Sequence, residues 1–198
     1  MTLILASTSA SRRTLLDAAG ISCDAVAPGV DEDELKAALK GEGATARAIA
    51  DALAEAKAVK ISRRHPEALV LGGDQMLALD DGTTFDKAAD MAELRRQLMR
   101  LRGGSHRLIS ALVIAEGGRA IWRHVDTARL HVRMFSEEWL DSYLAAEGET
   151  LLWGVGGYRI EERGVQLFSR IEGDQFTIRG LPLLPLLDYL RTRGEIPA

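Results

Sequence analysis

The residues near the amino terminus combine hydroxyl and guanidinium groups in a spacing suited to binding an anion. A short apolar run, residues 3–6, is followed by serines that include Ser7 and Ser9, and then by the paired Arg12 and Arg13. This layout predicts a strand, a turn and a helix start, where free N–H groups and the helix dipole favour negative charge. Arginine adds a planar fork of donors that fits phosphate oxygens. A buried first strand beside a solvated arginine pair is the bland alternative, and this stretch alone does not decide between them.

A carboxylate in the middle of the chain is the next candidate for chemistry. Asp74 follows Gly72 and Gly73, which come after the apolar run 68–71. An acidic residue just past the carboxyl end of a buried strand stands where open α/β sheets bind ligands, and glycine lets a ligand approach the backbone closely. A structural turn accounts for the same three residues equally well.

A second acidic stretch, residues 31–34, lies between an extended segment and a predicted helix. Acidic residues favour a helix N-terminus because they complement its dipole, and this is our interpretation of Asp33 and Glu34. Asp31 and Glu32 directly follow the extended segment, where their carboxylates can face a cleft instead.

The remaining chemistry is defined partly by what the sequence lacks. It has no P-loop, no Ser-His-Asp pattern and no cysteine nucleophile. The glycine-rich stretch 154–157 lacks the third glycine and the following helix of a dinucleotide-binding motif. Lys57 lies near the border of the apolar face of a predicted helix, where most lysines are solvated. Cations and carboxylates without a nucleophile suggest metal-assisted attack of water on a phosphate ester.

The elements that must position these residues follow from periodicity and from capping and turn signals. An Asp-Asp-Gly turn at 80–82 indicates a hairpin. We expect strands or extended segments at 3–6, 23–30, 68–71, 76–79, 108–115, 120–132 and 165–171, and helices at 14–19, 35–40, 45–61, 91–101, 137–145 and 183–191. Strands and helices alternate early and antiparallel strands dominate the middle, so the prediction is one α/β domain over 1–198 with a mixed, partly antiparallel sheet.

Composition limits the partners of the chain. Its 198 residues are 46% hydrophobic and 27% charged, as in ordinary globular proteins, and its net charge is −4. That charge argues against broad binding of nucleic acid or a membrane surface, although a local basic pocket remains compatible with it. The single cysteine, Cys23, excludes an internal disulfide and fits a reducing compartment. The first residues do not resemble a signal peptide, so we expect a cytoplasmic location.

Several motifs, in order along nearly the whole chain, resemble those of the Maf family of nucleoside triphosphate pyrophosphatases, which was first linked with septum formation. They are LILASTSASRRTLL at 3–16, VDE at 30–32, AEAKA at 54–58, GGDQ at 72–75, IEGD at 171–174 and GLPLLPLL at 180–187. The resemblance implies an elongated Maf/ITPase-like α/β fold with a central cleft, often forming a homodimer. It also implies hydrolysis between the α- and β-phosphates of a nucleotide with a divalent cation such as Mg, Mn or Co.

The resemblance assigns roles to individual residues of this sequence. Asp74 matches the proton acceptor for the attacking water, and Glu32 matches a catalytic or metal-associated carboxylate. The phosphate-contacting and charge-neutralising positions are Ser7, Ser9, Arg12, Arg13, Lys57 and Lys87. A fully ionised triphosphate carries about four negative charges, so several cations are needed before a carboxylate can approach it. With an ordinary pKa near ~4, Asp74 is a weak base, and we expect it to orient a water that the metal makes more acidic.

Three further positions mark branches of the family that differ in substrate, and here they are Ser11, Gln75 and Glu161. Gln75 and Glu161 resemble the branch acting on 7-methyl-GTP rather than the branch acting on dTTP and UTP. A carboxylate suits the N–H donors of a guanine edge. Ser11 departs from the bulky or basic residue usual there and cannot stack on a cationic base. The implied substrate is a broad or modified set of nucleotides, with 7-methyl-GTP the leading candidate.

Two other functions remain open from the sequence. The septation link allows a non-catalytic regulator that binds a nucleotide or a division partner through a vestigial site. Joint retention of Asp74, Glu32 and both arginines weighs against it. A phosphatase that releases inorganic phosphate would use similar residue types, and product analysis separates it from a pyrophosphatase.

Overall fold

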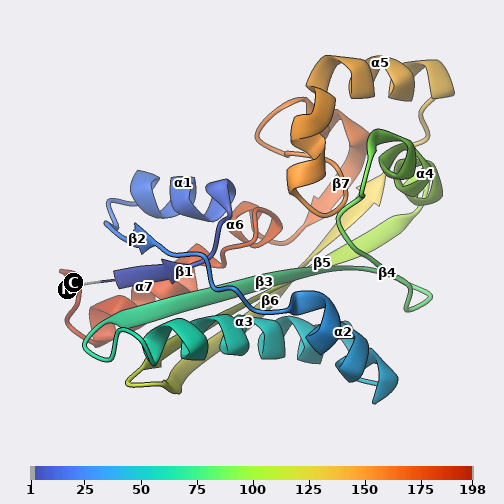
Figure 1. Ribbon diagram of the computed structural model, residues 1–198. Coiled ribbons are helices and arrows are strands. Elements are labelled where there is room, and N and C mark those ends of the chain that lie inside the picture. The colour runs from blue at the N-terminus through green and yellow to red at the C-terminus, as the bar shows by residue number, and fades with distance from the viewer. Residues whose placement is uncertain (1–2, 198) are drawn as a thin grey trace.

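The backbone is a mixed sheet of seven strands with helices on both faces, as seen in a computed structural model that describes residues 3–197 (Figure 1). The predicted α/β class is therefore confirmed. The strands are β1 (Leu3–Ala6), β2 (Asp24–Ala25), β3 (Leu69–Leu79), β4 (Thr84–Phe85), β5 (Ser105–Glu116), β6 (Arg119–Val132) and β7 (Phe168–Glu172). The α-helices are α1 (Ala10–Ala18), α2 (Glu32–Gly41), α3 (Ala46–Ser62), α4 (Met91–Leu101), α5 (Glu137–Glu147), α6 (Gln175–Ile178) and α7 (Leu183–Thr192), with 3₁₀ helices η1 (Gly148–Trp153) and η2 (Arg163–Leu167).

The sheet is parallel at one side and antiparallel at the other. Its strand order is β2-β1-β3-β5-β6-β7, with β4 paired to β3 off this path. Strands β2, β1 and β3 run parallel, whereas β3, β5 and β6 form long antiparallel ladders. The mixed character predicted from the alternating and then antiparallel segments is thus confirmed.

Successive side chains of β3 point to opposite faces of the sheet, so they pack against different helices. Met76 and Ala78 pack with α3, which runs along one face of the sheet (Figure 1). On the opposite face, Leu71 belongs to a cluster with α1 and α7, whereas Leu77 belongs to a separate cluster with α4 and α5. The two clusters leave the middle of β3 between them.

Helix α3 lies unusually close to β3 at Gly72. A Cβ built there would come 2.2 Å from the backbone oxygen of Ala54 and 2.8 Å from the backbone nitrogen of Ala58. Only a residue without a side chain allows this approach. Gly72 therefore sets the distance at which α3 holds its side chains over the sheet.

Several expected elements differ in detail. Residues 72–75 continue β3 without a break, so neither the predicted strand end nor the alternative turn at the glycines is correct. Antiparallel pairing with β5 from Val70 to Leu79 outweighs the intrinsic flexibility of glycine. The strand predicted at 165–171 begins at Phe168, because the preceding residues form η2. The short helix α6 was not predicted, since four residues give almost no periodicity.

The hairpin at 80–82 and the long helices agree with the sequence. Strands β3 and β4 pair antiparallel around Asp80-Asp81-Gly82. Thr45 and Ser136 cap α3 and α5 through their hydroxyl oxygens. Within the described residues, no helix combines the length and apolar character that a membrane crossing needs. The expected domain, 1–198, extends beyond residues 3–197 at both ends.

Candidate active site

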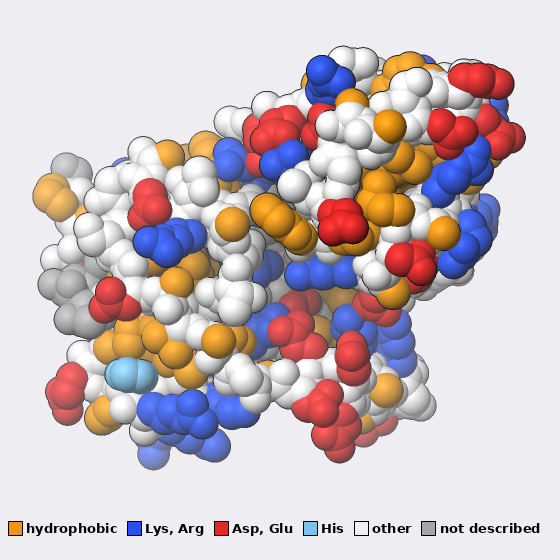
Figure 2. All heavy atoms as spheres, turned by 45° about the horizontal axis from the view of Figure 1, so that its top comes forward, with side chains coloured by type: hydrophobic (Ala, Val, Ile, Leu, Met, Phe, Trp, Pro, Cys, Tyr) orange, Lys and Arg blue, Asp and Glu red, His pale blue; other side chains and the backbone are white. Residues whose placement is uncertain are grey.

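One edge of β3 is open where its neighbouring strands stop. Strand β1 pairs with β3 up to Gly72, and β4 begins to pair at Leu77. Among the described residues, no strand covers positions 73–76 on this edge. Figure 2 shows a hollow over the middle of the molecule, with acidic and basic side chains gathered at its floor. The open edge gives side chains of β3 a place to meet residues from other elements.

Asp74 forms an ionic cluster at this edge with residues from two helices. Lys57 Nζ of α3 lies 2.7 Å from Asp74 Oδ1 and 2.9 Å from Glu32 Oε2 of α2. Lys57 and Asp74 are buried, so Lys57 is not at the solvated border that periodicity suggested. Burial raises the pKa of the Asp74 carboxyl, while the charge and hydrogen bond of Lys57 limit that rise. A carboxylate with a raised pKa is a better proton acceptor than an exposed aspartate.

The start of α2 gives different positions to Asp31 and Glu32, the two acidic residues whose role the sequence did not decide. Asp31 caps the helix, because its Oδ1 accepts a hydrogen bond of 3.0 Å from the backbone nitrogen of Glu34. Of the two roles that the sequence left open for Asp31, helix capping is therefore the one observed. Glu32 lies in the first helical turn and its carboxylate reaches Lys57.

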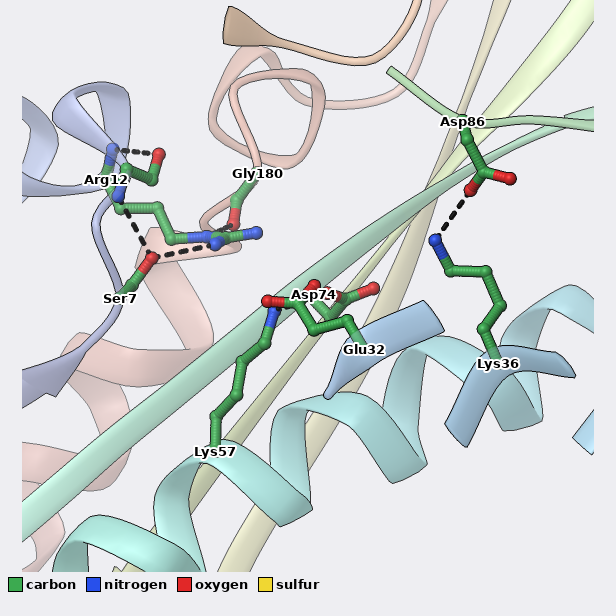
Figure 3. A network of polar contacts seen from close by, with 9 residues as sticks. Ser7, Arg12, Glu32, Lys36, Lys57, Asp74, Asp86 and Gly180 are labelled. Atoms are coloured by element: carbon green, nitrogen blue, oxygen red, sulfur yellow. Dashed lines mark hydrogen bonds and ion pairs between the residues drawn. The ribbon is translucent and has the colours of Figure 1, made fainter. Parts of the chain in front are cut away.

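Ser7 and Arg12 form a second polar group facing the first across the open edge (Figure 3). Arg12 Nε donates to Gly180 O at 2.7 Å, and Arg12 Nη1 donates to Ser7 Oγ at 3.1 Å. Ser7 Oγ also accepts from the backbone nitrogen of Ser9, which leaves its hydroxyl hydrogen available to a ligand. Arg12 Nη2 has no hydrogen-bond partner within residues 3–197, and the guanidinium extends toward Asp74 (Figure 3).

The other predicted phosphate ligands are placed differently. The Ser9 hydroxyl caps α1 by accepting from the backbone nitrogen of Arg12. The Arg13 side chain is 64% exposed and pairs with Asp17 on α1, so the structure does not bring it to the cluster. Lys87 lies in the loop before α4. Partial burial and the charge of Arg12 lower the pKa of Lys87.

Comparison with known proteins assigns the chain to a family. The model of a family described as "Maf-like protein" matches residues 2–193. The chain belongs to the Maf family. A Caulobacter vibrioides protein named nucleoside triphosphate pyrophosphatase is 55% identical over 192 residues, which are 97% of this chain and 96% of that protein. A Mesorhizobium japonicum protein named 7-methyl-GTP pyrophosphatase is 48% identical over 194 residues, 98% of this chain and 97% of that one.

A solved structure is also similar to this Maf chain, with lower sequence identity than these relatives. It is a nucleoside-triphosphatase, dITP/XTP pyrophosphatase, from Mycobacterium abscessus. The TM-score is 0.36 and the identity 17%, over 74% of this chain and 94% of the other. The α/β class of the Maf chain rests on its own sheet and helices.

The three positions that the family resemblance links with substrate choice meet at one short segment of the Maf chain. Ser11 Oγ donates to Arg179 O at 3.1 Å, and Gln75 Nε2 donates to the carbonyl oxygens of Thr177 and Ile178, each at 3.0 Å. Glu161 Oε1 lies 3.3 Å from Arg179 Nε. Helix α6 and the residue after it therefore connect all three positions, although they come from distant parts of the chain.

Sequence reasoning missed Arg179, Lys36 and Asp86 among the polar residues near the site. Arg179 is the arginine that Glu161 contacts. Lys36 of α2 donates to Asp86 Oδ1 at 2.6 Å (Figure 3). The charged pattern of α2 and the Phe-Asp-Lys sequence at 85–87 were visible signals, but neither indicates its partner about 50 residues away.

Proposed function

We propose that this Maf chain is a nucleoside triphosphate pyrophosphatase that cleaves between the α- and β-phosphates and releases a nucleoside monophosphate and pyrophosphate. The observation that carries the proposal is the buried Asp74 carboxylate, paired with Lys57 and facing the partly free Arg12 guanidinium. The family and the names of its similar members support the same reaction class.

The cationic and acidic residues of the site would have different roles. Arg12, Lys57 and Lys87 would neutralise the phosphates, and the Ser7 hydroxyl would donate to a phosphate oxygen. Asp74 would orient a water and accept its proton as the water oxygen bonds to the α-phosphorus. The bond from that phosphorus to the bridging oxygen then breaks, and pyrophosphate carries away the electron pair.

A divalent cation fits the donor set. Oxygens of Asp74 and Glu32 both lie within 3 Å of the Lys57 ammonium, so the two carboxylates already converge on one positive charge. No group of three or more metal-binding side chains occurs in the part of the chain described. Two carboxylates with substrate phosphates are a common arrangement for Mg²⁺, and Mn²⁺ or Co²⁺ would accept similar oxygens. The ion would supply positive charge that stabilises the phosphates in the transition state.

The base preference we propose is for guanine-type nucleotides, with 7-methyl-GTP the leading candidate. Glu161 offers a carboxylate to the N–H donors of guanine, and Arg179, whose Nε lies 3.3 Å from Glu161 Oε1, would orient that carboxylate. The Gln75 amide nitrogen is already bonded to α6, so Gln75 would act by holding that helix. The relative named 7-methyl-GTP pyrophosphatase supports this choice.

Product analysis tests the proposal. Purified protein is incubated with 7-methyl-GTP, GTP, ITP, dTTP or UTP and with magnesium, manganese or cobalt, and all phosphate products are separated. We expect monophosphate and pyrophosphate, with turnover reduced at least about 100-fold in Asp74→Asn because a general base is lost. Arg100→Gln is a control for general loss of positive charge, since Arg100 is exposed and pairs with Asp81 at the β3–β4 turn.

Other products would decide between the remaining functions. Release of inorganic phosphate would indicate a phosphatase. A folded protein that turns over no nucleotide with any of the metals would contradict the proposal and favour a binding protein connected with septation. We propose that the enzyme is located in the cytoplasm. The single cysteine, Cys23, is a free thiol, which is compatible with a reducing compartment. A homodimer stays a prediction.

A further inference from the structure

An ion pair outside the predicted site bridges two of the elements that surround it. Lys36 Nζ lies 2.6 Å from Asp86 Oδ1, and Lys40 Nζ lies 3.8 Å from Asp86 Oδ2. The Lys36 side chain is only 16% exposed, whereas that of Lys40 is 40% exposed. Figure 3 shows Lys36 and Asp86 beside the Asp74 cluster, on the side away from Arg12.

Helix α2 depends on such contacts because its packing is sparse. None of its residues is buried. Leu35 and Leu39 are partly buried where they pack against the hydrophobic cluster between α3 and the sheet. Glu32 and Lys36 are four residues apart and therefore lie on the same face of the helix. The face that carries the Glu32 carboxylate to Lys57 is thus also the face that Lys36 ties to Asp86.

Asp86 in turn connects α2 to α4. Its backbone oxygen accepts from Gln97 Nε2 of α4 at 3.2 Å, so the residue is fixed from one side by α4 and from the other by Lys36. Partial burial lowers the pKa of Lys36, but the hydrogen bond and charge of Asp86, together with the charges of Asp74 and Asp33, raise it overall, so Lys36 stays an ammonium. The residue after Asp86 is Lys87, one of the lysines to which the family resemblance assigns charge neutralisation.

We propose that Lys36 is a positioning residue that, through Asp86, fixes α2 against the loop before α4 so that the Glu32 carboxylate is held at Lys57. The inference rests on the proposed function and adds to it a residue that touches neither the substrate nor the metal. A partly exposed ion pair adds little to the global free energy of unfolding, so we expect its effect on the local stability and placement of α2. Removing a residue that holds a metal-binding side chain in its orientation typically lowers metal affinity or activity by roughly 10- to 100-fold.

Steady-state kinetics on three variants test this role. Lys36→Met should lower kcat/KM by about tenfold, the lower end for an orienting residue. Lys36→Arg should restore most of it, because Arg can still reach a carboxylate. Lys40→Met is the matched control: it removes the same charge from the same helix at the more distant, exposed contact, and should stay within about twofold. Equal losses in Lys36→Met and Lys40→Met would overturn the proposal, as would less than twofold loss in Lys36→Met.

A double-mutant cycle separates positioning from an independent effect. If Lys36 acts through Glu32, Lys36→Met should cost clearly less in a Glu32→Gln protein than in the wild type. Fully additive losses would contradict a role through Glu32. Asp86→Asn gives the same test from the other partner, should Lys36→Met fail to fold.

Hydrogen exchange provides a readout that needs no turnover. In the free protein, Lys36→Met should speed amide exchange in residues 32–41, whereas Lys40→Met should leave those amides close to the wild type. Unchanged exchange in Lys36→Met would overturn the proposal even if activity fell. A wild-type protein without pyrophosphatase activity would contradict the proposed function, and exchange would still decide whether Lys36 fixes α2.

Discussion

Lys57 Nζ lies 2.7 Å from Asp74 Oδ1 in a buried pair that joins α3 to the open edge of β3. Two opposing effects act on the carboxyl of Asp74. Burial raises its pKa, and the Lys57 ammonium lowers it, with burial the larger. The pair therefore sets the protonation of the residue that we propose as the proton acceptor.

The pH dependence of activity should report this balance. Asp74 must be ionised to accept a proton, so kcat/KM should rise with pH through a pKa above the ordinary aspartate value of 3.8. Lys57→Met removes the charge that favours the ionised form, and should move this acidic limb to higher pH, whatever its effect on the maximal rate. The measurement is kcat/KM of each variant from pH 4 to 8, normalised to its own maximum. Lys60→Met is the control on α3, and a limb that Lys57→Met leaves in place would exclude Asp74 as the titrating group.

Gly72→Ala should test the close approach of α3 to β3. The added Cβ would meet the backbone of Ala54 at 2.2 Å, so the helix must move away from the sheet and take Lys57 with it. We expect a loss of about 2 kcal/mol in the free energy of unfolding, as in other overpacked cores, together with reduced activity. Urea unfolding measures the first. Gly154→Ala is the matched control, since a Cβ at that position would have nothing within 4 Å, and equal stability of both variants would contradict the packing argument.

His106 should make stability fall in mild acid. It is fully buried beside the Tyr158 hydroxyl, and burial lowers its pKa from 6.5 to about 4. Because the unfolded chain binds the extra proton more readily, the contribution is fully present above pH 6.5 and is lost as pH falls toward 4. The shift corresponds to about 3 kcal/mol.

Unfolding by urea at pH 7 and pH 4.5 checks the size of this effect. His106→Gln keeps a polar group near Tyr158 and should show a smaller loss of stability between the two pH values than the wild type. The exposed His65 supplies the control, and His65→Gln should keep the wild-type loss. Parallel pH profiles for wild type and His106→Gln would refute the assignment.

Arg179 should influence base preference through Glu161. Arg179→Met removes the partner that lies 3.3 Å from Glu161 Oε1 and leaves that side chain free to move. We expect the ratio of kcat/KM for 7-methyl-GTP over UTP to fall by about tenfold, the effect of losing one oriented polar contact. Arg193→Met breaks a comparable arginine–glutamate pair, with Glu116 at the β5–β6 turn, and should leave the ratio unchanged. A ratio that responds equally to both variants would argue against a role in base choice.

Local signals in the sequence determined most of the elements. Thr45 and Ser136 cap the helices predicted after them, and the leucines of 91–101 mark the buried side of α4. The long antiparallel pair followed from two apolar runs around a glycine turn. Such signals act between residues a few positions apart, so a sequence pattern can contain them. Asp74, Glu32 and the amino-terminal motif were identified from their types and their family resemblance.

Tertiary packing decided which of these residues meet. Arg12 turns inward to a carbonyl 168 positions away while its neighbour Arg13 stays in solvent, and both have the same side chain. Lys57 is buried because Gly72 allows α3 to lie close against β3. Lys36 pairs with Asp86, which lies in the loop between β4 and α4. These contacts join segments that are adjacent only after the sheet has formed. Their geometry depends on strand register and helix distance, which local propensity does not contain.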